Sequence, residues 1–361
     1  MAGQLACLSS RASKQVVTKL LVVFFCAGFI LTLIKFTPSD VLPDSIQSFK
    51  AVPDATTRSN YRACRENNIA GSQHRWNAAR QRYLHLKDDK FTCKEAANIG
   101  ELTGGFPRAR FYSIAMQTYN RRDELNETLH SILSEEIPSL LEVVVVWNNV
   151  DEQAPADYVS KHRVPVRYRQ SPVNSLNQKL WPDPAYKTQA ILLSDDDVHY
   201  HPSDVEFAFQ AWREFGQHRM TGALARCAEP IEDGKLRYSL CAEDQDAYAM
   251  VLTSLAFAHI SFMDYYWSDE ADMTTMRKYV DRHMNCEDIA MNHVTSLLTG
   301  QGPLQVAGRK RYVNMEPASG ISRKPGHLGA RSQCLDDFAD IFGCKALINE
   351  TGHIQRSVVV L

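Results

Sequence analysis

Short apolar runs separated by polar segments dominate the chain from about residue 108 onward. One run contains four consecutive valines, a pattern typical of strands that are buried on both faces. Strands are predicted at residues 111–118, 140–149, 164–170 and 190–198. Because a helical pattern lies between such runs, the sequence predicts an α/β fold with a mostly parallel sheet.

The clearest helical pattern follows the first predicted strand. Leu125, Leu129 and Ile132 fall on one face at helical spacing, as does the neighbouring Leu133. Asn120 and Asp123 form a candidate capping pair at the start of this helix.

The second half of the chain has a mixed pattern. Strands are predicted at 220–227, 236–241 and 248–262, the last running into a short helix or loop, and a helix is predicted at 284–298. These elements fit one α/β domain, residues 106–361, with extra elements at its C-terminal end.

A charge-free apolar segment lies near the N-terminus, at residues 20–34 between Lys19 and Lys35. It is short for a bilayer span, which takes about 20 residues, but flanking residues extend it to 16–36. Since basic residues precede it, it predicts a signal-anchor with a cytosolic tail at 1–15 and a lumenal body. A cleaved signal peptide is the alternative. The polar residues 37–105 are predicted to form a stem with a short helix around 76–86.

The overall charge and the cysteines narrow the class of protein. A formal net charge of −2 argues against nucleic acid as a partner. Nine cysteines, most of them beyond the apolar segment, indicate an oxidising compartment in which several pair. The lack of any CxxC pair argues against a zinc site. Asn126 and Asn349 open Asn-x-Thr triplets and are candidate glycosylation sites.

Three consecutive carboxylates, Asp195, Asp196 and Asp197, lie at the end of the strand predicted at 190–198. Open α/β sheets bind ligands beyond the carboxyl ends of their strands, and a hard cation such as Mn²⁺ or Mg²⁺ would screen the repulsion between these acids. The sequence therefore favours a metal and diphosphate site here, with an exposed acidic turn as the alternative. His199 and His201 are close enough to supplement it, although loop histidines are more often solvated. No P-loop and no GxGxxG motif is present.

Polar side chains follow the other predicted strands as well. The ends of parallel strands meet at one edge, so we expect these side chains to gather there, with amides suited to a base and cations suited to phosphate. They are Gln117, Arg121, Asn148, Asn149, Asn174 and Lys179.

A further acidic group opens the predicted helix at 284–298. Asn285 and Asp288 have the spacing of a capping box, which would make both structural. Alternatively, a disulfide from Cys286 to a later cysteine would bring Arg331 close to Asp288, where a cation stabilises charge on a leaving phosphate.

Several of these motifs together resemble one family. They are QTYNR at 117–121, VVVWNN at 144–149, the three aspartates, NCEDIAMN at 285–292, and RSQC at 331–334 followed by FG. Over residues 108–350 the chain is similar to the C-terminal domain of exostosins and exostosin-like proteins, glycosyltransferase family 64. The resemblance implies a GT-A fold, a Mn²⁺-dependent, retaining transfer from a UDP-sugar, and a type II membrane protein of the Golgi or endoplasmic reticulum.

The resemblance also implies residue roles. Asp197 would contact the metal, with Asp195 and Asp196 around the ribose and the metal waters. Asp288 would be the catalytic carboxylate, Arg331 its cationic partner, and Asn285 a substrate contact. Cys286 would pair with Cys334. The uridine and diphosphate would be held by Gln117, Arg121, Asn148, Asn174 and Lys179.

Two residues and one segment depart from the family pattern. Lys179 stands where the family has arginine, Glu287 where aspartate is usual, and residues 320–329 align poorly. The leading hypothesis is a transferase of an N-acetylhexosamine to a glycan, glycoprotein or glycolipid, and association with itself or with other transferases stays open. A catalytically silent lumenal partner of another transferase is the alternative, and a nucleotidyltransferase is a third.

Overall fold

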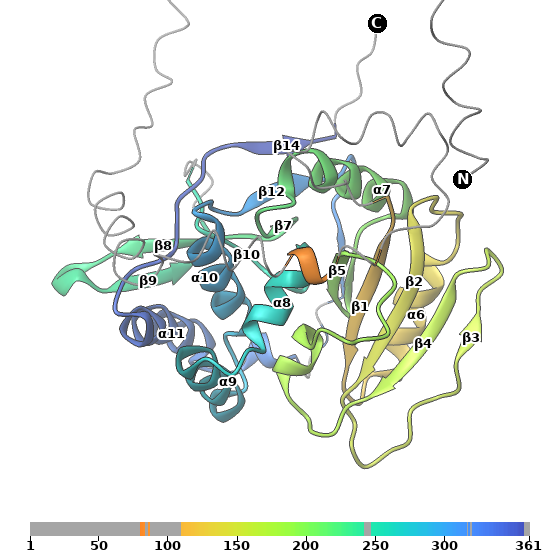
Figure 1. The fold of residues 1–361 in the computed structure, drawn as a ribbon, viewed down its shortest axis with the longest axis horizontal. Coiled ribbons are helices and arrows are strands. Elements are labelled where there is room, and N and C mark those ends of the chain that lie inside the picture. Colours follow the sequence, from red (N-terminus) through yellow and green to blue (C-terminus); the bar gives the residue numbers. More distant parts are fainter. Residues whose placement is uncertain are drawn as a thin grey trace, which may run out of the picture. The chain divides into compact units, whose positions relative to one another are not determined.

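A computed structural model describes residues 80–83, 86, 110–241, 247–315, 317 and 320–356. Figure 1 shows a twisted sheet with helices packed against both of its faces. The predictions for the tail at 1–15, the anchor at 16–36 and most of the stem at 37–105 lie outside the described residues. Among the described residues, none of the helices combines the length and the apolar character needed to cross a bilayer.

The centre of the nine-stranded sheet consists of four parallel strands. They are β1 (Tyr112–Thr118), β2 (Leu140–Trp147), β4 (Pro165–Gln170) and β5 (Ala190–Asp195). These strands confirm the four sequence predictions. β1 lies between β2 and β5, and Gln117 is in register with both Val146 and Asp195, so the carboxyl ends of the strands meet at one edge.

The remaining strands extend or flank this centre. β3 (Tyr158–Val159) and β11 (Leu255–His259) pair antiparallel with β4 and β5. Beyond β11 follow β7 (Thr221–Gly222), β12 (Leu304–Ala307) and β14 (His353–Gln355). A three-stranded sheet contains β8 (Ala225–Pro230), β9 (Leu236–Ser239) and β10 (Met250–Val251). β6 (Val198–His199) pairs with β13 (Val313–Asn314).

Two strand predictions were wrong in detail. Residues 220–227 contribute to β7 and β8, and residues 248–262 to β10 and β11, and in each case the two strands lie in different sheets. Gly222 packs so closely on β11 that a Cβ there would lie 2.2 Å from the Leu255 carbonyl oxygen. The chain then leaves the large sheet, and Leu224 accepts a backbone hydrogen bond from Leu252.

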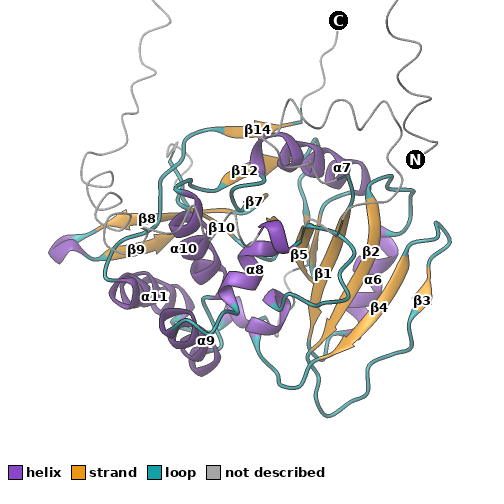
Figure 2. Cartoon of the chain, viewed as in Figure 1, coloured by secondary structure: helices purple, strands orange, loops and turns teal. Residues whose placement is uncertain are grey.

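Helices cover both faces of the central strands (Figure 2). Alternate strand residues, such as Ile114 and Val143, pack with α6 (Arg122–Ile132) and α7 (Pro202–Ala211). The intervening residues pack with α8 (Ile260–Tyr266), α9 (Ala271–His283), α10 (Glu287–Thr299) and α11 (His327–Phe342). The short helical segments are η1 (Leu176–Leu180), η2 (Trp212–Gly216), η3 (Glu232–Gly234) and η4 (Ile321–Arg323). Burial on both faces explains the valine run of β2.

The capping pair predicted for α6 is absent. Arg121 occupies the N-cap position and makes no side-chain cap hydrogen bond. Asn120 adopts a positive φ of 54°, and its Oδ1 instead accepts a hydrogen bond of 2.6 Å from Asn149. The two amides thus tie the ends of β1 and β2 together.

Part of the predicted stem packs on the domain. Residues 80–82 are helical, which agrees with the short helix predicted around 76–86. Arg80 is buried, and the Tyr83 hydroxyl donates a hydrogen bond of 2.8 Å to Asp264 of α8. Arg82 forms an ion pair of 2.8 Å with the same carboxylate. The folded unit therefore includes residues N-terminal to the boundary expected at 106.

Candidate active site

The polar residues predicted to gather at the sheet edge do so. Gln117 and Asn148 lie at the ends of β1 and β2 and are buried, and the Asn148 amide nitrogen donates to the Ser175 carbonyl at 2.8 Å. Among the described residues, none donates a hydrogen bond to the side-chain oxygen of Gln117 or of Asn148. Such a buried acceptor is costly unless a ligand satisfies it. Asn174, half-buried, precedes Ser175 in the loop after β4.

The three aspartates form a cluster, and one arginine pairs with two of them. The Arg121 guanidinium lies 2.6 Å from Asp196 Oδ1 and 2.6 Å from Asp197 Oδ2. Burial raises the pKa of Asp196 to about 7 in spite of this ion pair. Burial and the neighbouring Asp195 likewise raise the pKa of Asp197. Thr128 of α6 donates a hydrogen bond of 2.7 Å to the Asp196 carbonyl and fixes the backbone of the cluster.

A buried lysine joins this cluster to α10. Lys179 Nζ lies 2.6 Å from Asp195 Oδ1 and 4.0 Å from Glu287 Oε1, and its side chain is only 1% exposed. Burial alone would lower the pKa of Lys179, but Asp195 and Glu287 outweigh it and raise the pKa. The ammonium group is therefore held between two carboxylates from opposite sides of the site.

Glu287 is the site residue that sequence reasoning missed. Burial and the adjacent Asp288 raise the pKa of Glu287 to about 7. The sequence marked Glu287 only as a departure from the family pattern. Its position, one residue before the predicted catalytic carboxylate and at the start of a buried helix, is the signal that could have identified it.

Asp288 and Arg331 meet in a buried ion pair, with Arg331 Nη2 2.5 Å from Asp288 Oδ2. Arg331 also donates to Asn285 Oδ1 at 3.2 Å and lies 4.4 Å above the Tyr238 ring centroid. Burial would lower the pKa of Arg331, but Asp288 and Tyr238 outweigh it and raise the pKa. The guanidinium therefore stays charged next to the carboxylate.

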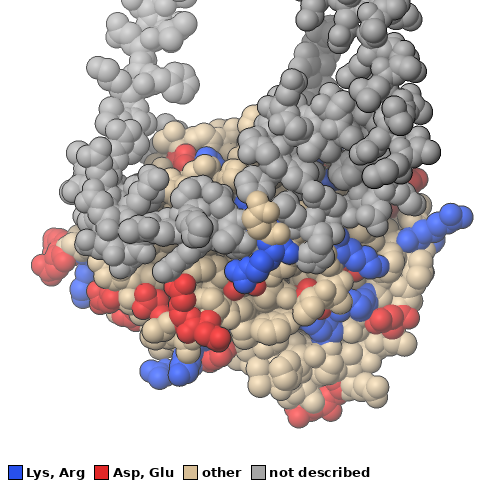
Figure 3. All heavy atoms as spheres, in the orientation of Figure 1, with Lys and Arg blue, Asp and Glu red and all other residues tan. Residues whose placement is uncertain are grey.

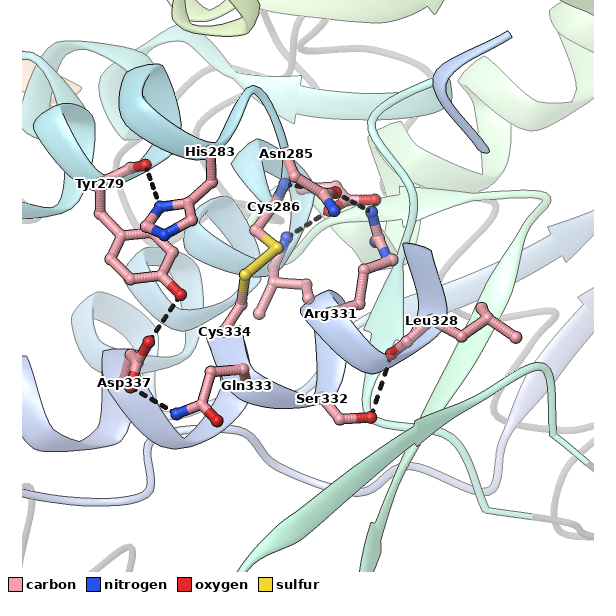
Figure 4. Close-up of a disulfide and its surroundings, with 12 residues drawn as sticks. Tyr279, His283, Asn285, Cys286, Leu328, Arg331, Ser332, Gln333, Cys334 and Asp337 are labelled. Carbon is pink, nitrogen blue, oxygen red and sulfur yellow. Dashed lines mark hydrogen bonds and ion pairs between the residues drawn. A yellow bond between two sulfur atoms is a disulfide. The ribbon is translucent and has the colours of Figure 1, made fainter. Parts of the chain in front are cut away.

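A disulfide joins the two helices that carry this pair (Figure 4). Cys286 bonds to Cys334 of α11, as the resemblance implied. The predicted capping box is absent, because Cys286 is the N-cap residue, with a positive φ of 75° and no side-chain cap hydrogen bond. Asn285 Oδ1 instead accepts from the Cys286 backbone and from Arg331.

The donor set at the sheet edge suits a hard cation. Asp195 and Asp197 supply carboxylate oxygens, and their side chains are 31% and 14% exposed. His199 is buried in β6, and His201 is the N-cap residue of α7. Within the described ranges, no group of three or more histidine, cysteine or acidic side chains is arranged to hold a metal. The chain thus offers one or two oxygen ligands, which is how Mg²⁺-type ions are bound together with substrate phosphates.

The remaining predicted modifications lie outside this site. Cys227 pairs with Cys241, and Cys344 is disulfide-bonded as well. Asn126 is exposed on α6, and Asn349 is half-buried near the C-terminal end of the described chain. Exposure of Asn126 is compatible with a glycan there.

Comparison with known proteins gives consistent results. The family model for the glycosyl transferase family 64 domain matches residues 112–359. Human exostosin-2 is 32% identical over 246 residues, which cover 67% of this chain and 33% of exostosin-2. Mouse exostosin-like 2 is 29% identical, with 64% and 72% covered. Glucosamine inositolphosphorylceramide transferase 1 of Arabidopsis thaliana is 33% identical, with 64% and 30% covered. The chain thus matches about a third of exostosin-2.

Proposed function

We propose that this chain, which belongs to glycosyl transferase family 64, is a retaining glycosyltransferase that moves a sugar from a UDP-sugar to an acceptor hydroxyl. The observation that carries the proposal is the buried Asp288–Arg331 pair, which α10 and α11 hold near the acidic edge of the sheet. Lys179 connects the two, because it contacts Asp195 at that edge and approaches Glu287, the neighbour of Asp288.

Asp288 is the proposed catalytic carboxylate. Retention of configuration requires either a covalent carboxylate intermediate or attack from the same face within an ion pair. A carboxylate beside the anomeric carbon serves both routes, as nucleophile or as a stabiliser of positive charge. Arg331 holds the carboxylate in place and adds positive charge near the departing diphosphate.

Gln117 and Asn148 are proposed to bind uracil. Their side-chain oxygens are buried acceptors that have no partner in the part of the chain that the structure describes, and the N–H of a pyrimidine base is a matching donor. Arg121 is proposed to reach the diphosphate, because its guanidinium already lies against Asp196 and Asp197 and is 23% exposed. Asn174 and Lys179 complete the proposed donor side.

A divalent cation, Mn²⁺ or alternatively Mg²⁺, is proposed as the cofactor. Asp197 would hold it, with Asp195 nearby, and the partly exposed carboxylates of these two residues fit such an ion. When bound, the ion would supply charge neutralisation for the leaving nucleoside diphosphate. Arg121 would then shift part of its pairing from Asp197 to phosphate oxygens.

The substrates and the location are proposed from the family alone. We propose an N-acetylhexosamine as the transferred sugar and a glycan, glycoprotein or glycolipid as the acceptor. One relative, glucosamine inositolphosphorylceramide transferase 1, names a lipid, which supports the glycolipid among these acceptors. We further propose a type II protein of the Golgi or endoplasmic reticulum membrane with a lumenal catalytic domain, in agreement with the two disulfides among the described residues.

Donor binding and donor hydrolysis test the proposal. UDP binding, measured by calorimetry, should require Mn²⁺ and be lost in Asp197→Ala. Slow hydrolysis of the correct UDP-sugar should be lost in Asp288→Asn while UDP binding is kept. Asp272→Asn, which also removes an acid from the first turn of a helix, is the matched control and should change neither.

Two results would contradict the proposal. One is UDP binding of equal strength with and without Mn²⁺. The other is the absence of hydrolysis for every UDP-sugar tested in a protein that binds UDP, which would favour the silent partner. The anomeric configuration of the released sugar, read by NMR, distinguishes retention from inversion.

A further inference from the structure

Asn292, the last residue of the NCEDIAMN motif, is the polar residue of that motif to which the site just described gives no role. It lies in α10, one turn after Asp288. Charged side chains of both signs reach the surface on the face shown in Figure 3, whereas Asn292 is an uncharged group with 2% exposure. A buried amide needs hydrogen-bond partners inside the protein, and these partners indicate its role.

The Asn292 side chain pairs with both backbone groups of Val251. Its Oδ1 accepts the Val251 N–H at 3.1 Å, and its Nδ2 donates to the Val251 carbonyl at 2.8 Å. Val251 is the last residue of β10, which is an edge strand of the three-stranded sheet. The amide therefore pairs with Val251 as a residue of a neighbouring strand would, because a carboxamide carries the same donor and acceptor as a peptide group.

The same amide nitrogen holds the first turn of α10. Asn292 Nδ2 also donates to the Asp288 carbonyl at 2.7 Å. The two residues are four positions apart and so lie on one side of the helix. A single buried side chain thus connects the backbone of β10 to the backbone of the proposed catalytic carboxylate.

The residues that follow Val251 lead to the acid cluster. We call residues 251–254 the bridge segment. The hydroxyl group of the buried Thr253 donates to Glu287 Oε1 at 3.5 Å, and the Ser254 carbonyl accepts the backbone N–H of Asp195 at 3.1 Å. The bridge segment is therefore hydrogen-bonded to α10 and, at its other end, to the acidic end of β5.

We propose that Asn292 is a positioning residue, which pairs with the bridge segment and thereby sets the position of Asp288 relative to the acid cluster. This inference rests on the proposed function, since it concerns the geometry of the same site. Asn292 acts through the Asp288 backbone and does not touch the substrate. A displacement of about 1 Å at a reacting group can lower a rate by about 100-fold, so the loss of this pairing should slow the reaction.

The test compares variants of the full chain. Asn292→Leu has a similar volume and removes all three hydrogen bonds of the amide. Asn292→Ala is the second variant, to be used if leucine prevents folding. The control is Thr295→Val, which keeps the side-chain shape and removes a buried hydrogen bond of 2.9 Å to the Met291 carbonyl in the same helix.

Two kinds of measurement separate positioning from stability. The first is the kcat and KM of UDP-sugar hydrolysis, together with UDP affinity in the presence of Mn²⁺, at a temperature well below the melting temperature of each protein. The second is hydrogen exchange, followed by mass spectrometry, in peptides that cover the bridge segment and the first turn of α10.

We expect kcat to fall about 10–100-fold in the Asn292 variants with KM and UDP affinity unchanged, and to stay within about twofold in the control. Hydrogen exchange in both peptides should become faster in the Asn292 variants alone. An unchanged kcat in a folded Asn292 variant, or an equal fall in the control, overturns the inference. Failure of both Asn292 variants to fold, with a folded control, would assign the amide to stability and also overturns it.

A wild type that hydrolyses none of the UDP-sugars would contradict the proposed function. Hydrogen exchange then decides the inference separately. Equal exchange in the wild type, the Asn292 variants and the control would overturn it, whereas faster exchange confined to the Asn292 variants would support it.

Discussion

Replacement of Lys179 by methionine is the sharpest test of how the two sides of the site are joined. The change leaves Asp195 and Glu287 without the cation between them. At 4.0 Å and an effective dielectric constant of about 20, the attraction to Glu287 alone is roughly 4 kcal/mol. Removing one partner of a buried pair costs about 3–5 kcal/mol. We expect the melting temperature to fall by about 10 °C.

The control is Lys187→Met, the same change in a lysine whose side chain is 54% exposed and 3.9 Å from Glu142. Only the lysine of this pair is exposed, and Glu142 keeps its hydrogen bonds from the Ser113 hydroxyl and the Lys187 backbone N–H. The lost attraction is therefore about 0–1 kcal/mol, and this variant should melt within about 2 °C of the wild type. Adding Glu287→Gln to Lys179→Met removes a stranded charge and should restore part of the loss. Equal melting of the two lysine variants, or a further fall in the double variant, would refute the reasoning.

Three more outcomes follow from the structure. Burial raises the pKa of Glu287 to about 7. Between about pH 4.5 and 7 the folded state therefore binds more protons than the unfolded chain, and stability falls as pH rises. Glu287→Gln should flatten this fall in melting curves recorded against pH. Arg331→Lys loses the planar guanidinium group that contacts both Asp288 and Asn285, so donor hydrolysis should fall roughly 10–100-fold while UDP affinity is kept. Unchanged hydrolysis would contradict the role of Arg331. A chain that begins at residue 106 should melt several degrees below one that begins at 75, because it lacks the contacts of Tyr83 with Asp264; equal melting would assign residues 80–86 to the stem.

The strands and the sheet edge were predictable because their signals are local. The valine run of β2 reports burial on both faces, and a parallel sheet necessarily brings Gln117, Asn148 and Asp195 to one edge. These features depend on periodicity and connectivity, which a sequence displays directly.

The features that were missed depend on tertiary contacts. The buried residues of α9 and α11 recur at helical spacing, but the tertiary fold decides which neighbours cover them. α9 packs on η1 and α11 on β9, as well as on α10. Both predicted caps were wrong because Asn120 and Asn285 have side-chain partners far along the chain, Asn149 and Arg331. Glu287 acquires its significance only from Lys179, more than 100 residues earlier in the sequence.

The disulfide between Cys286 and Cys334 makes the proposed transfer activity depend on the redox conditions under which the chain folds. If thiols stay reduced, α10 and α11 are held together at this point by the salt link and by packing alone. The proposed nucleotide site, which lies at strand ends that contain no cysteine, would still assemble. Material made in a reducing cytoplasm should thus recognise its donor yet transfer slowly, and oxidation after purification should raise turnover without new synthesis.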